Sequence, residues 1–543
     1  MKLIQCQMKP YVQPFERKLA LSELAALSKA TPQVSKTSLT QGTLFQVAQP
    51  TTYEVQTNES VDFLANRLAY WEYLRGERLR ATNQVLNEST LNVVRNGVPL
   101  ELLPRLVPFK KDIPTPNRRC LRYGPHGIHE YRGKFFPQLV VALMNIAKVP
   151  TGGVVVDPMC GSGTTPVEAT MAGCQGLAMD LNPLSVFMTR TKCALLRTAP
   201  KQIKHAYEVV RDRLLKCPPP RFSEEMPYFR SLPQTDRSYL LTWFSKQVLA
   251  DLDKIAETIS CTRPGPSADL LRLSLSNVLR KVSWQKEDDL RVRKEMKADV
   301  DLDPMKEFLE QSGRSVRTVL ALLYQIKGRK LGSCEVLEGD ARRFHSIWPH
   351  IAGDVDAVIT SPPYATALPY LDTDRLSLIY LRLLPRSEHR KRDQEMIGNR
   401  EITDRNRQAQ WKAFQANKDV LPQGVVDVIE RIYKLNLTKS VGFRRRNLPS
   451  LLAKYFLDMR SVLAAMAKML RPRAPAYVVV GDNHTIAGGQ RVEIGTATHL
   501  ANIAETVGLE IQDRLSMDML VSRDIFKKNA VEAECILFLR RRP

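Results

Sequence analysis

The pattern that most constrains the fold is a strand, a glycine loop and a helix in direct succession. The stretch GGVVVDPMCGSGTTPVEATMAG (residues 152–173) begins with a short apolar run, passes through two glycines and continues with helical character. The next stretch, CQGLAMDLNPLSVFMTRTKCAL (residues 174–195), repeats the strand and helix signals. Strands that alternate with helices form a parallel sheet with crossover helices. We therefore expect an α/β fold with a doubly wound, mostly parallel sheet.

The same alternation returns in the second half of the chain. Strand patterns occur in SCEVLEGDARR (residues 333–343) and VDAVITSPPY (residues 355–364), and LLAKYFLDMRSVLAAMAKML (residues 451–470) has helical spacing. A strand in AYVVVGDN, a further helix, and two late strands in LEIQDRL (residues 509–515) and AECILFLRR (residues 533–541) complete the pattern. One α/β domain is therefore split by the segments that lie between these patterns.

Those intervening segments are rich in Lys and Arg, and most of their length has helical periodicity. Within the first 117 residues, Val61–Leu86 has apolar residues at helical spacing and an arginine-rich opposite face, which predicts a helix. Arg105–Arg119 is basic and proline-rich, and it predicts a linker. We expect an N-terminal extension of unknown role at 1–117, three parts of the α/β domain at 118–198, 333–384 and 450–543, and basic inserts at 199–332 and 385–449.

The charge balance narrows the class of partner. The 543 residues include 80 Lys and Arg against 57 Asp and Glu, a formal net charge of +23. Such an excess favours a polyanion, most often nucleic acid, through neutralisation of phosphates and release of counterions. No apolar run reaches the roughly 18 residues of a membrane span, so no membrane partner is expected. Nine cysteines without a CxxC pair indicate a reducing, cytoplasmic setting, and no metal site is expected.

The glycine loop is suited to a nucleoside ligand. The first strand ends in Asp157, and Gly161 and Gly163 precede a helix that begins near Thr164. Glycines let the backbone approach a ligand closely, and the loop delivers that ligand to a helix N-terminus. No Lys-Ser/Thr follows the last glycine, so the loop is not a phosphate-binding P-loop, and the full GxGxxG of dinucleotide folds is absent.

The acids at the two strand ends narrow the ligand further. Asp180 ends the second strand, where an acid of a doubly wound sheet accepts hydrogen bonds from ribose hydroxyls. Asp157 suits a ligand with a positive ammonium rather than a pyrophosphate. S-adenosylmethionine, a nucleoside with an amino-acid tail, meets both conditions. The predicted cofactor-binding residues of this region are Asp157, Cys160 (as a small packing residue), Gly161, Ser162, Gly163, Thr164, Asp180 and Asn182.

Two motifs together resemble a known family. DPMCGSGTTPVEA (residues 157–169) followed by TSPPY (residues 360–364) is similar to the DNA amino-methyltransferases, which methylate exocyclic amines of bases. HEYRGKFFPQL (residues 129–139) resembles the segment that closes over the methionine part of the cofactor, and LEGDARR (residues 337–343) resembles the motif near the adenine. The resemblance covers 120–200 and 333–543, less the inserts. It implies a Rossmann-like class I methyltransferase fold with an antiparallel last strand, and it adds Phe136, Pro137 and Asp340 to the cofactor site.

The resemblance assigns catalysis to Ser361, Pro362, Pro363 and Tyr364. A serine in first place resembles the cytosine-N4 branch, whereas adenine-N6 and guanine-N2 enzymes more often have Asp or Asn there. The target base has to leave the duplex, and its amine has to be held so that the nitrogen becomes pyramidal. The Ser361 hydroxyl is an acceptor for that amine, and the Tyr364 ring offers a face for stacking.

The function implied by the resemblance is site-specific methylation of the N4 amine of cytosine in DNA, by base flipping, in restriction–modification or epigenetic marking. DNA is then the partner, with a cognate restriction nuclease in the first case, in a cytoplasmic, nucleoid-associated setting. Three alternatives stay open at this point: a DNA adenine-N6 methyltransferase, an RNA (tRNA) guanine-N2 methyltransferase, and a nucleic-acid-binding protein that keeps the fold without the activity.

Predictions can also be made for the inserts and for single residues outside these motifs. The 199–332 insert is the first candidate for target recognition, and 385–449 is the second, with Arg444, Arg445 and Arg446 as phosphate contacts. His126 and His129 are expected to form structural hydrogen bonds. Phe135 and Phe136 are either both core residues, or one of them covers the cofactor. Asn483 and His484 also have two open interpretations, as turn residues or as pocket residues.

Overall fold

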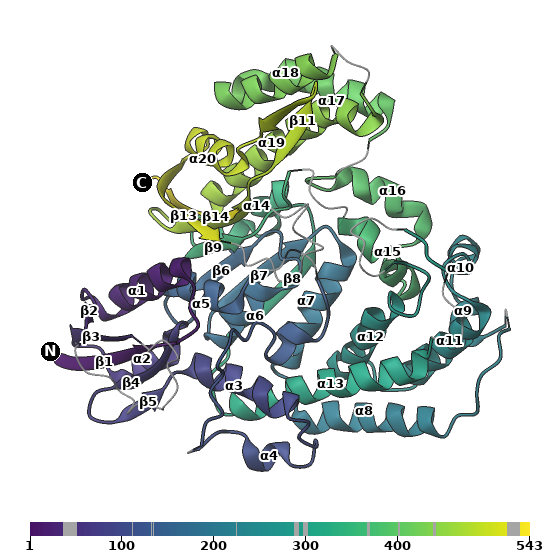
Figure 1. Ribbon diagram of the computed structural model, residues 1–543, viewed down its shortest axis with the longest axis horizontal. Coiled ribbons are helices and arrows are strands. Elements are labelled where there is room, and N and C mark those ends of the chain that lie inside the picture. Colours follow the sequence, from purple (N-terminus) through teal and green to yellow (C-terminus); the bar gives the residue numbers. More distant parts are fainter. Residues whose placement is uncertain are drawn as a thin grey trace.

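The computed structural model describes most of the chain in three lobes around a central sheet (Figure 1). The strands of the central sheet lie in the middle, the N-terminal region packs to one side, and two helical regions extend from the opposite side and from the top. The described residues are 1–35, 51–110, 112–131, 133, 135–223, 225–286, 293–296, 302–365, 370–399, 402–437, 441–518 and 533–543.

The central sheet has seven strands in the order β13-β14-β10-β9-β6-β7-β8. All pairs from β8 to β10 are parallel, and β14 is antiparallel to both of its neighbours. This order, with one reversed strand near the edge, is the class I methyltransferase topology, so the fold predicted from the sequence is confirmed. The strands are β6 (Val154–Asp157), β7 (Gln175–Asp180), β8 (Cys334–Glu338), β9 (Ala357–Thr360), β10 (Pro475–Gly481), β13 (Leu509–Asp518) and β14 (Ala533–Arg541).

Alternate residues of the central strands face two different helical layers, as the period of a strand requires. Val155 and Ile359 belong to the core that contains α5, whereas Val156 and Val358 belong to the core that contains α19 and α20. Both faces of the central sheet are therefore buried beneath helices, which explains why these strands are continuous apolar runs. The helices of the α/β domain are α5 (Pro137–Ile146), α6 (Thr164–Met171), α7 (Pro183–Leu195), α14 (Phe344–Ile347), α15 (Tyr370–Tyr380), α19 (Phe443–Met469) and α20 (Thr496–Thr506).

The N-terminal region folds around a separate antiparallel sheet of order β2-β3-β1-β4-β5. The single helix predicted over Val61–Leu86 is wrong, since Trp71 and Leu74 pair with β1 as part of a strand and are fully buried. Apolar residues at these positions fit both a helical and a strand period. The elements are β1 (Lys2–Met8), α1 (Pro14–Ser28), β2 (Gln33–Val34), β3 (Thr52–Thr57), α2 (Val61–Arg67), β4 (Trp71–Arg75), β5 (Leu79–Ala81), α3 (Asn83–Arg95) and α4 (Leu103–Leu106).

A buried ion pair within this region is hydrogen-bonded to the α/β domain. Lys9 Nζ lies 2.6 Å from Glu88 Oε1, and both side chains are almost completely buried. A buried pair is tolerated only when further hydrogen bonds compensate for lost hydration. Lys9 also donates to the carbonyl of Ala69, and Gln138 of α5 donates to Glu88 at 2.9 Å. The two regions therefore share one polar network.

The first insert is helical, as its periodicity predicted. Its helices pack on one another and on α7 around a core that includes Leu252, Leu271 and Leu320. The helices are α8 (Pro200–Leu215), α9 (Pro227–Arg230), α10 (Gln234–Leu240), α11 (Lys246–Ser260), α12 (Pro266–Leu279) and α13 (Pro304–Gln325).

The second insert forms α16 (Arg386–Glu395), α17 (Asp404–Asn417) and α18 (Gln423–Leu437), and its last predicted residues belong to α19. Pro449, where the sequence placed the end of this insert, lies inside α19. Proline lacks the N–H that would pair with the carbonyl of Arg445. The side chain of Asn436 donates to that carbonyl at 2.8 Å, which satisfies the helix from outside.

A β-hairpin that the sequence patterns did not indicate follows β10, with strands β11 (His484–Ala487) and β12 (Gln490–Glu493). Short 3-10 turns occur at Gly124–Gly127, Ala341–Arg343, Pro349–Ile351 and Lys418–Val420. No helix in the described ranges is both long and apolar enough to cross a membrane.

Candidate active site

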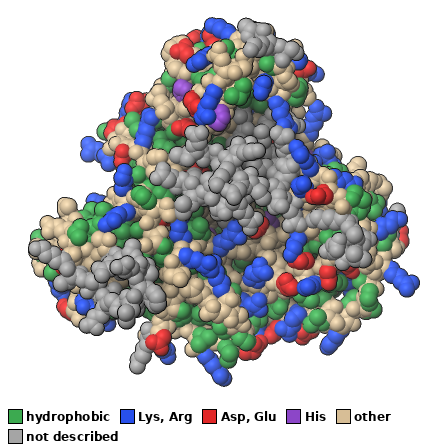
Figure 2. Space-filling view, in the orientation of Figure 1, with side chains coloured by type: hydrophobic (Ala, Val, Ile, Leu, Met, Phe, Trp, Pro, Cys, Tyr) green, Lys and Arg blue, Asp and Glu red, His purple; other side chains and the backbone are tan. Residues whose placement is uncertain are grey.

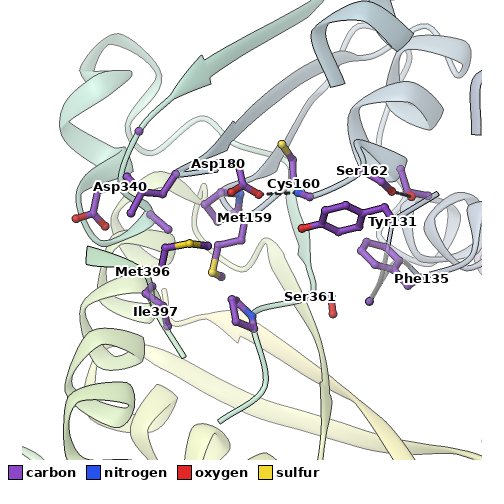
Figure 3. A pocket seen from close by; sticks show the side chains of 18 of the residues that line it. Tyr131, Phe135, Met159, Cys160, Ser162, Asp180, Asp340, Ser361, Met396 and Ile397 are labelled. Atoms are coloured by element: carbon purple, nitrogen blue, oxygen red, sulfur yellow. Dashed lines mark hydrogen bonds between the residues drawn. The ribbon is translucent and has the colours of Figure 1, made fainter. Parts of the chain in front are cut away.

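A pocket of about 730 Å³ opens at the carboxyl edge of the central sheet (Figure 3). Its wall is built from segments that follow β6, β7, β8 and β9, together with residues that precede α5 and residues at the end of α16. Figure 3 shows Tyr131, Asp180, Ser361 and Met396 arranged around the same space.

The glycine loop takes a shape that only glycine allows at two points. Gly161 has φ of 47° and Gly163 has φ of 80°. A Cβ at Gly161 would lie 2.8 Å from Tyr131 Cε1, and one at Gly163 would lie 2.6 Å from Thr189 Oγ1. Gly161, Cys160, Ser162 and Thr164 line the pocket, whereas Gly163 lies behind it as the N-cap of α6.

Asp180 fixes the loop and also faces the pocket. One carboxylate oxygen accepts the Gly161 N–H at 2.8 Å, and the other accepts the Asn182 N–H at 2.9 Å. Burial raises the pKa of this carboxyl to about 6. Asn182 itself does not line the pocket, because its side chain caps α7 and donates to Asp374 at 3.0 Å.

A buried lysine is hydrogen-bonded to the backbone of the glycine loop. Lys192 of α7 is fully buried, and its Nζ donates to the carbonyl of Ser162 at 2.7 Å. An ammonium is rarely left in a dry site unless it has partners. The bond to Ser162 therefore constrains the loop backbone at its pocket-lining point.

Asp157 has a different place from the one that the sequence predicted. It is fully buried and does not line the pocket, so it does not face a ligand ammonium directly. Its Oδ1 accepts the hydroxyl of Thr360 at 2.7 Å and the Met159 N–H at 3.2 Å. Burial raises its pKa to about 7. Asp157 therefore ties the end of β6 to the last residue of β9.

The Ser361–Tyr364 turn follows β9 directly and is only partly in the pocket. Ser361 and Pro363 line the wall, whereas Pro362 is buried beneath it. The Tyr364 hydroxyl bonds to Glu534 of β14, so its ring is not part of the pocket wall. Asn483 donates to the carbonyl of Ala365 at 2.6 Å, which supports the turn. Thr366–Pro369 lie outside the described residues.

The segment before α5 contributes one of the two phenylalanines considered from the sequence, together with two further residues. Tyr131, Gly133 and Phe135 line the pocket, whereas Phe136 and Pro137 do not. Phe136 is the N-cap of α5, and its ring lies 4.2 Å from the guanidinium carbon of Arg119. The first insert holds this segment in place, since Asn277 accepts the Glu130 N–H at 2.9 Å. Arg132 and Lys134 are not among the described residues.

Two histidines near this segment have structural partners, as expected. His126 Nε2 lies 2.6 Å from Glu168 Oε1 of α6, and both side chains are buried. His129 Nε2 lies 2.9 Å from the Ser276 hydroxyl of the first insert.

Asp340 lines the pocket after β8, as the sequence predicted for the position. Both of its oxygens accept bonds from the Arg342 guanidinium at 2.9 Å or less, and its pKa is lowered by these bonds although burial opposes the shift. Beside it lie Glu395, Met396 and Ile397 of the second insert. No motif marked these three residues, whereas Tyr131 belongs to a segment that the sequence had singled out.

Comparison with known proteins supports a methyltransferase. Residues 129–211 match the family model UPF0020, described as an RMKL-like methyltransferase domain. The chain is 22% identical to the type II methyltransferase M.BsoBI of Geobacillus stearothermophilus, over 60% of this chain and 64% of that protein. It is 21% identical to M.AvaI of Nostoc sp., over 70% of this chain and 78% of that protein. The chain thus spans just under two thirds of M.BsoBI.

Solved structures give weaker likenesses. TrmN from Thermus thermophilus has a TM-score of 0.31 at 11% identity, covering all of both chains. The rRNA methyltransferase aviRa from Streptomyces viridochromogenes has a TM-score of 0.27 at 10% identity, covering 76% of this chain and 88% of that one. The fold assignment therefore depends on the strand order above. The domain is a class I methyltransferase domain, whose methyl donor is S-adenosylmethionine.

We predict that Thr360→Val destabilises the protein more at pH 8 than at pH 5.5. Asp157 is charged above its pKa of about 7, and the charged carboxylate then loses its hydroxyl donor. An unsatisfied buried acceptor costs about 1–3 kcal/mol. Below this pKa Asp157 is neutral, and loss of the hydroxyl donor then lowers the free energy of unfolding by less. Thr170→Val is the control, because the Thr170 hydroxyl donates to an uncharged carbonyl. Calorimetric unfolding at both pH values measures the difference, and equal losses for Thr360→Val at both values would contradict it.

We also predict that Lys192→Met weakens binding of S-adenosylmethionine by about tenfold, or roughly 1.4 kcal/mol, while Lys192→Arg retains more of the affinity. The methionine fills the buried space but cannot donate to Ser162. Titration calorimetry measures the dissociation constant, and circular dichroism checks folding. A folded Lys192→Met protein with unchanged affinity would rule out this role.

Proposed function

We propose that this chain, which carries a class I methyltransferase domain, methylates the exocyclic N4 amine of cytosine in DNA. The observation that carries the proposal is that Ser361 and Pro363 lie on the wall of the same pocket as the glycine loop. A methyl donor held by the loop and an amine held by the Ser361 turn would share one cavity, which is the geometry that group transfer requires.

The pocket residues fit S-adenosylmethionine. Asp180 still has acceptor capacity for ribose hydroxyls, because a carboxylate offers about four lone-pair sites. Tyr131 covers Gly161, and Asp340 lies on the wall that follows β8. When bound, S-adenosylmethionine supplies a methyl group activated by its sulfonium.

The turn after β9 supplies acceptors for an amine. Pro362 and Pro363 have no N–H, so these two positions offer backbone carbonyls only, and the Ser361 hydroxyl is a further acceptor. The bond from Thr360 to Asp157 fixes the start of the turn relative to the glycine loop. Ser361 is therefore the residue proposed to accept a hydrogen bond from the cytosine amine and to orient its nitrogen.

DNA is the proposed substrate because the net charge, the named relatives and the distribution of cationic side chains all favour it. The net charge is +23, and the relatives named type II methyltransferases belong to a class that modifies DNA. Figure 2 shows Lys and Arg side chains grouped near the centre of one face, between the N-terminal region and the first insert. Arg444, Arg445 and Arg446 are exposed in the first turn of α19, where phosphates could reach them. A cognate nuclease and a nucleoid location are part of the same proposal.

We expect the purified protein to form N4-methylcytosine in DNA. The test incubates unmethylated bacteriophage DNA, which contains any short recognition sequence many times, with S-adenosylmethionine that carries a deuterated methyl group. Mass analysis of the nucleosides then identifies the labelled base. If N6-methyladenine is the only labelled base, the protein is an adenine-N6 methyltransferase. In a parallel incubation with RNA, label in RNA but not in DNA would contradict the proposal.

Two substitutions should separate positioning of the substrate amine from binding of the cofactor. Ser361→Ala should lower kcat by about 100-fold, with little change in the dissociation constant of S-adenosylmethionine, because it removes an acceptor for the substrate. Asp180→Ala should raise that constant by about 10- to 100-fold, since it removes bonds to a charged group. Ser346→Ala is the control, because its hydroxyl bonds only to a carbonyl of its own turn and is exposed. Equal losses of turnover and binding in Ser361→Ala would refute the assigned role.

A further inference from the structure

The residues that end α16 lie between the two parts of the active site. We call Glu395–Gly398 the α16 turn. Glu395, Met396 and Ile397 line the pocket on the side of Asp340 (Figure 3). Met396 and Ile397 are each 8% exposed, so the turn is packed rather than free in solvent. The turn belongs to the second insert, which the sequence assigned to DNA contact and, as the second candidate, to target recognition.

Cationic side chains hold the backbone of the α16 turn. Arg342 donates to the carbonyl of Glu395 at 2.9 Å, and Lys454 donates to the carbonyl of Met396 at 3.2 Å. Arg342 is the residue that also binds both oxygens of Asp340. Arg392 of α16 donates to the carbonyl of Leu181, beyond the end of β7, at 2.7 Å. The turn is therefore fastened to the segments that follow β7 and β8 and to α19.

The other end of the α16 turn touches the turn assigned to catalysis. Gly398 has φ of 76°, and a Cβ there would lie 3.0 Å from Pro363 Cβ and 3.2 Å from the carbonyl oxygen of Tyr364. Contacts of 3.0–3.2 Å are closer than side chains normally accept, so no space remains between the two turns. A displacement of Gly398 toward the Ser361–Tyr364 turn would therefore push against Pro363 or Tyr364.

We propose that the α16 turn is a positioning element that couples occupancy of the cofactor pocket to the geometry of the Ser361–Tyr364 turn. The proposal relies on the function proposed above for these two sites. A ligand that packs against Met396 and Ile397 restrains the α16 turn, and Gly398 transmits the restraint to Pro363 and Tyr364. Coupling between two sites is reciprocal, so an ordered catalytic turn also favours a filled cofactor pocket.

Hydrogen–deuterium exchange tests the coupling without any requirement for activity. The probe is S-adenosylhomocysteine, the demethylated form of the donor. In the wild-type protein we expect it to slow exchange at the amides of 395–399 and also at the amides of Tyr364 and Ala365, which do not line the pocket. In Gly398→Ala we expect the protection of Tyr364 and Ala365 to fall by about threefold or more.

The matched control is Gly97→Ala. Gly97 has φ of 72°, close to that of Gly398, but nothing lies within 4 Å of its Cβ position. It therefore reproduces the backbone strain without the contact, and its protection pattern should equal that of the wild type. Met396→Ala, which leaves Gly398 in place, should weaken binding of S-adenosylhomocysteine by about tenfold. This second variant keeps the test informative if Gly398→Ala fails to fold.

Two results would overturn the coupling: unchanged protection of Tyr364 and Ala365 in folded Gly398→Ala, or no ligand-dependent protection of 395–399 in the wild type. Failure of the wild-type protein to methylate DNA is a separate outcome. It would refute the proposed function, while the exchange pattern would still establish or refute the coupling.

Discussion

Parallel pairing of β8, β7, β6 and β9 is the constraint on which the rest of the molecule depends, since it brings four carboxyl strand ends to one edge of the sheet. Segments that are far apart in the sequence then share a pocket. Two hydrogen-bonded carboxylates fix the geometry at that edge. Asp180 holds the glycine loop through Gly161, and Asp157 holds the end of β9 through Thr360. The first bond joins the end of β7 to the loop after β6, and the second joins the end of β6 to the end of β9.

The fold was predictable because its signals are local. The strand, the glycine loop and the helix at 152–173 lie in one short stretch, and buried strands on both faces give continuous apolar runs. The N-terminal region was not predictable in the same way. Trp71 and Leu74 satisfy two periodicities, and the choice between them is made by pairing with β1, more than sixty residues earlier in the chain.

The candidate site was predictable only where a motif carried it. Gly161, Asp180, Asp340 and Ser361 lie on the pocket wall, whereas Asp157 and Tyr364 point to protein partners instead. A sequence pattern gives the position of a residue on a strand end, but not the direction in which its side chain points. The α16 turn lacks a motif altogether, because its place depends on bonds from Arg342 and Lys454 that close long loops of chain. The roles of all these residues stay predictions.

Helix α19 passes through a proline without a break, and a side chain of α18 compensates for the missing hydrogen bond. Pro449 leaves the carbonyl of Arg445 without its normal partner, and Asn436 of α18 supplies the missing donor. If α18 moved away, that carbonyl would have no substitute within the helix, and the backbone at Pro449 would be free to kink. The same Asn436 side chain accepts the N–H of Gly488, between β11 and β12, at 3.3 Å. One buried amide therefore ties α18 both to the first turns of α19 and to the hairpin that follows β10.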